Sequence, residues 1–158
     1  VNDVSTDTVR PPLFTEAATR RPNGANPVEY AGDAAAEVQR ARYPDIRPFI
    51  VPRRVTDAFE LVGQALRRLG YEVVREQEPE RNRFGIVEAV DRTFLLGFRD
   101  DVVVRVARAQ RGARIDVRSA SRWGTHDFGA NAERVRAVLN AIVDRLELTV
   151  PADGQPPQ

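Results

Sequence analysis

The sequence predicts an α+β fold, in which an antiparallel sheet of about four to five strands carries two helices packed on one face. Three observations lead to this fold class: helical periodicity at both ends of residues 53–150, strand-like runs between the helices, and short polar connections between those runs. Short connections join antiparallel neighbours, because parallel strands need crossovers of about a dozen or more residues. A length of 158 residues suits one domain.

Residues 1–52 are predicted to form an extended, proline-rich arm that precedes the domain. Prolines interrupt any long helix or central strand here: Pro11, Pro12, Pro22, Pro27, Pro44, Pro48 and Pro52. Apolar residues such as Phe14 and Phe49 indicate that parts of the arm lie against the domain. Asp33 is expected to cap a short helix over residues 34–41, before Pro44 excludes helical geometry at the residue that precedes it.

The globular domain is predicted to span residues 53–150. Its first helix is expected to begin at the N-cap Thr56 and to end at Gly70. Five strand-like runs follow, over residues 71–75, 84–90, 93–98, 102–107 and 114–120. The second helix is expected over residues 130–148, with an apolar stripe at Val135, Val138, Leu139, Ile142 and Leu146. Residues 151–158 have the composition of a disordered tail.

The clearest hairpin is predicted to turn at Arg111–Gly112, in a register that places Arg105 opposite Arg118 on the outer face of the sheet. Two neighbouring guanidinium groups require an anion between or beside them. Asp116 is one candidate for this anion, and a carboxylate from a ligand or partner is the other.

Composition excludes several classes of function. Cysteine is absent, which removes disulfides, thiolate metal sites and cysteine nucleophiles. All 24 basic side chains are arginine, and residues 105–122 hold six of them with the single acid Asp116, so a locally basic face is expected. Nucleic acid is not the expected partner, because Trp123 is the one ring near these arginines. With no methionine, the chain is expected to be a processed product or a fragment.

Residues 118–135, RSASRWGTHDFGANAERV, concentrate the polar chemistry. One hypothesis is a hydrolase-like site in which His126 contacts both Ser121 and Asp127, although neighbouring turn residues rarely orient one another in this way. A second is a divalent cation held by Asp100 or Asp101; adjacent residues on an extended strand point to opposite faces, so one of the two at most would serve.

Two further hypotheses use the arginines of this segment. In one, backbone amides at Gly124 and Gly129 join Arg118, Arg122 and Arg134 in binding a phosphate or carboxylate. In the other, the same arginines bind aspartates of the chain itself, and the network holds no ligand. Asp127 is expected either to accept such arginines or to cap the second helix, and Asn131 to bond loop carbonyls.

The runs FLLGFRDDVVVRV and RIDVRSASRWGTHDFGANAERV resemble the domain of unknown function 1499 family. The resemblance extends back through VSTDTVRPPLF, NPVEY and YPDIRP, and so covers nearly the whole chain. It singles out the signature residues Asp100, Asp101, Arg118, Ser119, Ser121, Arg122, Gly124, Asp127, Gly129, Asn131 and Arg134. It implies a bacterial domain that follows a membrane portion, which we expect on the periplasmic side. Other members carry a cysteine-containing segment that this chain lacks.

We therefore expect a non-enzymatic binding or interaction domain, tethered at a membrane, that takes a protein partner or an anionic small molecule without a cofactor or metal. The candidate binding residues are Arg105, Arg118, Ser119, Ser121, Arg122, Trp123, Asp127, Asn131 and Arg134. Asp100, Asp101, Gly124 and Gly129 are expected to support them structurally. The alternatives are the hydrolase-like site and a purely structural subunit.

Overall fold

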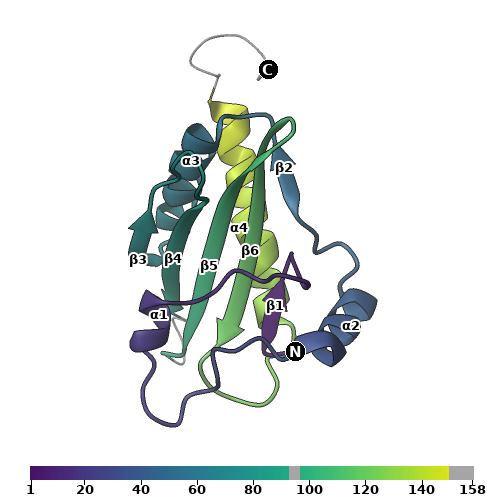
Figure 1. Ribbon diagram of the computed structural model, residues 1–158. Helices are drawn as coiled ribbons and strands as arrows, with labels where there is room; N and C mark the ends of the chain where they lie inside the picture. The colour runs from purple at the N-terminus through teal and green to yellow at the C-terminus, as the bar shows by residue number, and fades with distance from the viewer. Residues whose placement is uncertain (93–96, 150–158) are drawn as a thin grey trace.

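The computed structural model describes residues 1–92 and 97–149, and its centre is one antiparallel sheet of six strands (Figure 1). The strand order is β1-β6-β5-β4-β3, and β2 also pairs with β6. The strands are β1 (Asp3–Ser5), β2 (Phe49–Val51), β3 (Glu72–Gln77), β4 (Gly85–Arg92), β5 (Arg99–Ala109) and β6 (Gly112–Ser121). The α+β class and the antiparallel pairing are confirmed, while the sheet has more strands than the four to five we expected.

Four helices surround the sheet: α1 (Glu16–Thr19), α2 (Gly32–Arg42), α3 (Val55–Arg68) and α4 (Ala130–Leu148). Helices α3 and α4 contact each other, and both lie behind the sheet in Figure 1. Their buried apolar residues form one cluster with Val102, Val104 and Val106 of β5. The main core therefore lies between the sheet and these two helices.

The opposite face of the sheet is covered by the N-terminal segment. Phe14 and Ala17 pack there against Ile86, Val103 and Ala120 in a second, smaller cluster. Strand β5 is consequently buried on both sides, because alternate residues along a strand point to opposite faces. Hereafter we call the two faces the helix face and the arm face.

The segment 1–52 contains two strands and two helices where we expected an extended arm. The physical reason is the free edge of β6, whose backbone groups need partners. Strand β1 covers the end of β6 that includes Arg118, and β2 covers the end that includes Ala113. The prolines flank these short elements and do not interrupt them: β2 fits between Pro48 and Pro52.

Gly70 follows the C-cap of α3 with a left-handed φ of 80°, as predicted, but the two predicted N-caps are wrong. Asp33 lies inside the first turn of α2 and Thr56 inside α3, and neither helix has a side-chain hydrogen bond at its N-cap. The bounds of α4 match the predicted 130–148. The predicted run 93–98 lies largely outside the described residues, as does the predicted tail, and β4 continues to Arg92.

The hairpin register is also corrected. Ala109 faces Gly112, so Arg105 lies opposite Asp116 and not opposite Arg118. The difference of two residues leaves every side chain on its predicted face. Gly112 has a φ of +103°, and a Cβ atom there would lie 2.1 Å from the carbonyl oxygen of Val51. Strand β2 therefore approaches the hairpin closely where glycine has no side chain.

No helix in residues 1–92 and 97–149 combines the length and hydropathy that a membrane span requires.

Candidate functional site

The signature residues do not form one site, because they divide between the two faces of the sheet. Arg118 of β6 and Arg122, which directly follows β6, point to the arm face together with Asp101 of β5. Ser119 and Ser121 point to the helix face, beneath the start of α4. The alternation of side chains along β6 makes this division unavoidable.

Arg118 is fully buried and holds three parts of the N-terminal segment together. Its guanidinium makes two hydrogen bonds to the carboxylate of Asp3, at 2.9 and 2.6 Å. It also donates to the backbone carbonyls of Pro12 at 2.9 Å and Val28 at 2.7 Å, and lies 4.7 Å from the ring centroid of Phe14. Every guanidinium nitrogen thus has an acceptor from the chain itself.

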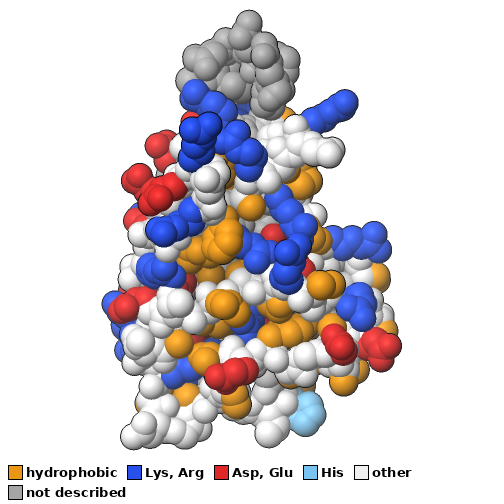
Figure 2. All heavy atoms as spheres, viewed as in Figure 1, with side chains coloured by type: hydrophobic (Ala, Val, Ile, Leu, Met, Phe, Trp, Pro, Cys, Tyr) orange, Lys and Arg blue, Asp and Glu red, His pale blue; other side chains and the backbone are white. Residues whose placement is uncertain are grey.

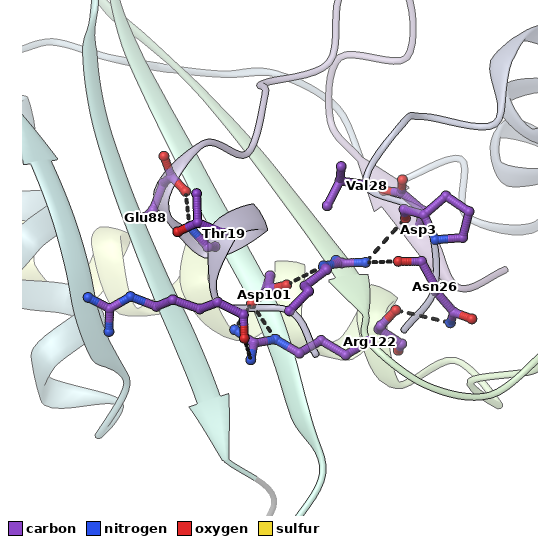
Figure 3. A network of polar contacts seen from close by, with 12 residues as sticks. Asp3, Thr19, Asn26, Val28, Glu88, Asp101 and Arg122 are labelled. Atoms are coloured by element: carbon purple, nitrogen blue, oxygen red, sulfur yellow. Dashed lines mark hydrogen bonds and ion pairs between the residues drawn. The ribbon is translucent and has the colours of Figure 1, made fainter. Parts of the chain in front are cut away.

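Asp101 is the second buried anchor on the arm face. Arg122 donates twice to Oδ1 of Asp101, at 2.9 and 2.7 Å, and Arg21 donates to Oδ2 at 2.8 Å. Figure 3 shows Arg122, which directly follows β6, close to Asp101 of β5, and Arg21 comes from the loop after α1. Arg122 also donates to the carbonyl of Arg20, and Asn26 donates to the carbonyl of Ser121. The pair therefore fixes residues 20–26 onto the sheet.

Glu88 of β4 is a third buried carboxylate on this face, and sequence reasoning missed it. Its oxygens accept the backbone N–H groups of Thr15 at 3.1 Å and Ala17 at 2.8 Å, and Arg75 donates at 3.0 Å. Burial opposes the charge, but these hydrogen bonds outweigh it and hold the pKa of Glu88 below its ordinary value. Glu88 therefore binds the start of α1.

Arg105 finds its anions within the chain. Its guanidinium contacts Asp116 and Asp7, each at 2.9 Å, and donates to the carbonyl of Arg10 at 3.0 Å. The pKa of Asp7 is lowered: burial opposes ionisation, while the backbone N–H groups of Arg10 and Val9 and the nearby arginines favour it more. Asp116 was one of the two expected anions, whereas Asp7 carried no signal in the sequence.

On the helix face, Arg134 of α4 is the centre of the network. It donates to Asp91 at 2.8 Å, to Asp100 at 2.7 Å and to the hydroxyl of Ser119 at 3.2 Å. The hydroxyl of Ser119 in turn donates a hydrogen bond to Oδ1 of Asn131 at 2.7 Å. Asp100 and Asp101 thus serve opposite faces, and no group of three acidic or histidine side chains in the described residues could hold a metal ion.

The hydrolase-like arrangement is not assembled. The hydroxyl oxygen of Ser121 is buried and accepts a hydrogen bond from Asn131 at 2.8 Å. His126 is exposed, and its ring contacts the hydroxyl of Thr125. Asp127 instead accepts the backbone N–H groups of Gly129 and Asn131 at the start of α4. These bonds outweigh burial and lower the pKa of Asp127.

Trp123 and Gly124 lie in the exposed part of the segment. The indole is 44% exposed, beyond the end of β6, and therefore does not cap the core completely. Gly124 has a φ of +89°, and its carbonyl accepts a hydrogen bond from Asn26. Gly129 is left-handed at the N-cap of α4. The amide of Gly129 donates to Oδ1 of Asp127 at 3.1 Å and is therefore already used within the chain.

The arm face also contains a groove that sequence reasoning did not find. It has a volume of about 570 Å³ and lies between residues 10–15 and strands β3, β4 and β5. Its apolar wall includes Pro11, Leu13, Phe84 and Ile86, and its cationic residues are Arg10, Arg75, Arg83 and Arg105. No acidic side chain lines it. Figure 2 shows hydrophobic side chains on this face with arginines on both sides of them. We call this feature the arm groove.

A family model described as protein of unknown function (DUF1499) matches residues 3–142. No curated protein matches the sequence. Among solved structures, the crystal structure of Ara h 8.0201 is 10% identical, with 62% of this chain and 95% of that chain covered and a TM-score of 0.29. The crystal structure of the di-domain ARO/CYC StfQ from the steffimycin biosynthetic pathway is 16% identical, covers 76% of this chain, and also has a TM-score of 0.29. This chain spans 60% of the StfQ chain.

Proposed function

We propose that this chain, which belongs to the DUF1499 family of proteins of unknown function, is a non-enzymatic module that binds an amphipathic anion in the arm groove. The observation that supports this most directly is the combination of an apolar wall with four arginines and no acid. The ligand class is a compound with an apolar chain or ring and a terminal carboxylate or phosphate.

The signature arginines are poor candidates for capturing an external anion. Arg118 and Arg122 are buried and already bound to Asp3 and Asp101, so a ligand would have to displace those carboxylates. Breaking a buried pair in this way costs about 3–5 kcal/mol. The expected binding role therefore moves from the signature residues to the groove that their network helps to build.

The groove offers donors that the protein does not use itself. The guanidinium of Arg10 has no hydrogen bond or ion pair within the described residues, and Arg83 has one exposed contact with Glu80 at 3.6 Å. Leu13 is 70% exposed and Phe84 is 47% exposed. A ligand that covers these two side chains while its anionic group meets Arg10 or Arg83 would bury apolar surface and gain charge-assisted hydrogen bonds.

The test is the binding of a dansyl-labelled undecanoic acid, followed by its fluorescence, with the methyl ester of the same compound as the neutral comparison. The acid should bind at least about tenfold more tightly than the ester, which corresponds to about 1.4 kcal/mol. Leu13→Asp should abolish most of this binding, because it places a carboxylate in the apolar wall.

The matched control is Val9→Asp, which makes the same change on the same segment at a side chain that is 84% exposed and outside the groove. Binding by Val9→Asp should equal that of the unmodified chain. Equal affinity for acid and ester, or equal loss in both variants, would show that the groove is not an anion site.

We also propose that the protein is tethered to a membrane with this domain on the periplasmic side. The support for both is the resemblance of the sequence to the DUF1499 family. Fractionation of cells that express the full-length protein, followed by protease treatment of spheroplasts, tests both. A protein that stays with the membrane and is digested in spheroplasts agrees with the proposal; one recovered in the cytoplasmic fraction contradicts it.

A further inference from the structure

Three aromatic side chains are exposed at one end of the molecule, away from the arm groove. Trp123 is 44% exposed, Phe98 is 49% exposed and Phe128 is 96% exposed. Phe98 immediately precedes β5, whereas Trp123 and Phe128 lie between β6 and α4; the start of β5 and the end of β6 are both at the lower end of the sheet in Figure 1. We call these three residues the aromatic tip. Exposure of a single large apolar side chain is common, whereas three aromatics at one end indicate an interaction surface.

Phe128 is held outward by its backbone. It is the one residue other than glycine with a positive φ in the described part of the chain, at 52°. It stands between Asp127, which binds the start of α4, and Gly129, the N-cap of that helix. The helix start therefore fixes the direction of a phenylalanine that contributes almost nothing to the core.

The charge at this end favours an anionic partner. A hollow of about 440 Å³ lies beside Trp123 and Phe98, with Arg20 and Arg99 in its lining and no acidic side chain. Arg122 also lines the hollow, but its guanidinium is already bound to Asp101 and does not serve as a donor for lipid. Arg99 has no ion pair within the described residues, while Arg20 pairs with Glu16 at 3.0 Å and with Glu72 at 3.6 Å. The carboxylates nearest along the chain are used in internal contacts: Asp100 binds Arg134, Asp101 binds Arg21 and Arg122, and Asp127 binds the start of α4.

We propose that the aromatic tip is a contact surface for an anionic phospholipid bilayer. Tryptophan and phenylalanine insert at the headgroup level, and arginines beside them meet lipid phosphates. Phe98 precedes β5, and Trp123 and Phe128 both lie between β6 and α4, so a flat bilayer surface can contact the two connections at the same time. This inference does not depend on the ligand of the arm groove, because none of the three residues lines that groove.

Trp123 is the single tryptophan of the chain, so its fluorescence reports on the tip alone. The chain should sediment with vesicles of equal parts phosphatidylcholine and phosphatidylglycerol at least about tenfold more than with pure phosphatidylcholine. On binding, the Trp123 emission should shift to shorter wavelength and be quenched by lipids brominated near the headgroup.

The variant Phe128→Ser should lower sedimentation with anionic vesicles by about tenfold, and Phe128→Trp should retain it. The matched control is Leu148→Ser, which removes an exposed apolar side chain at the C-terminal end of α4, outside both the aromatic tip and the arm groove. Because Phe128 is nearly fully exposed, its replacement should leave the thermal unfolding midpoint unchanged, so a loss of sedimentation cannot be attributed to unfolding.

Three results would overturn the proposal: no sedimentation with either vesicle, equal effects of Phe128→Ser and Leu148→Ser, or a Trp123 emission shift that depends on protein concentration without vesicles. The last result would identify the tip as a contact between two copies of the chain. Failure here would leave binding in the arm groove untouched, since that assay uses Leu13 and Val9.

Discussion

Replacing Arg118 by methionine should destabilise the protein more than any surface substitution. The guanidinium is fully buried and makes four hydrogen bonds, two to Asp3 and two to backbone carbonyls. Arg118→Met keeps the aliphatic stem but leaves a carboxylate and two carbonyls without their donor. Removal of one partner of a buried ion pair costs about 3–5 kcal/mol. The Asp3 side chain is 15% exposed and water can reach it partly, so we expect about 3 kcal/mol.

The control is Arg136→Met, because Arg136 makes similar contacts at the surface. It also donates twice to one aspartate, Asp45, at 2.7 and 2.9 Å, and it lies 5.5 Å from the ring centroid of Tyr43. Its side chain is 32% exposed and that of Asp45 is 54% exposed. Exposed pairs contribute about 0–1 kcal/mol. The difference between the two variants thus isolates the effect of burial.

The assay is urea unfolding of both variants, followed by circular dichroism, with the free energy of unfolding taken by linear extrapolation. The double variant Asp3→Asn/Arg118→Met should lose less than the sum of the two single changes, because it removes both charges. If Arg118→Met lowers the free energy of unfolding no more than Arg136→Met does, the signature arginines do not stabilise the packing of the N-terminal segment on the sheet.

Two further predictions follow from the same contacts. The pKa of Glu88 is lower in the folded protein than in the unfolded chain, so its ionised form stabilises the fold above the ordinary pKa of about 4.3, and this stabilisation is lost as the pH falls below it. Glu88→Gln should therefore be less stable than the unmodified protein at pH 7, but its free energy of unfolding should fall less steeply in acid. An unchanged slope in acid would contradict this prediction. Gly112→Ala should lower the free energy of unfolding by about 2 kcal/mol or more, and Gly32→Ala, at a φ of +78° with open space around it, should lose less in the same urea titration.

The sequence predicted the elements whose pattern is local. Helix α4 was predicted with its bounds because its apolar stripe repeats every three to four residues. The faces of β5 and β6 were also predicted, since apolar and charged residues alternate over 104–106 and 113–118. The hairpin register was not, because a shift of two residues keeps the same faces and only the approach of Val51 to Gly112 decides it.

The contacts of the signature residues could not be predicted as well from the sequence, because the residues that bind one another are far apart along the chain. Asp3 and Arg118 are 115 residues apart, and Thr15 and Glu88 are 73 apart. Asp7 lies in the run VSTDTVRPPLF and Glu88 in a predicted strand, but nothing local in either segment marks the residue as an ion-pair partner. The division of the signature between two faces was implicit in the alternation along β6, but the carboxylates that satisfy Arg118 and Arg122 could be identified only in the folded chain.

The polar residues of 118–135 are therefore better explained by the contacts that fix the N-terminal segment to the sheet than by binding of an external ligand. Arg118 uses three nitrogens to reach four acceptors from three separate stretches of the N-terminal segment, which the compact ammonium of a lysine could not span. That fixation brings residues 10–15 alongside β3 and β4, and so it builds one wall of the arm groove. Groups available to an external partner lie elsewhere, at Arg10 and Arg83 in the groove and at the aromatic tip. A chain can thus carry a polar signature that is far from the surface on which its function depends.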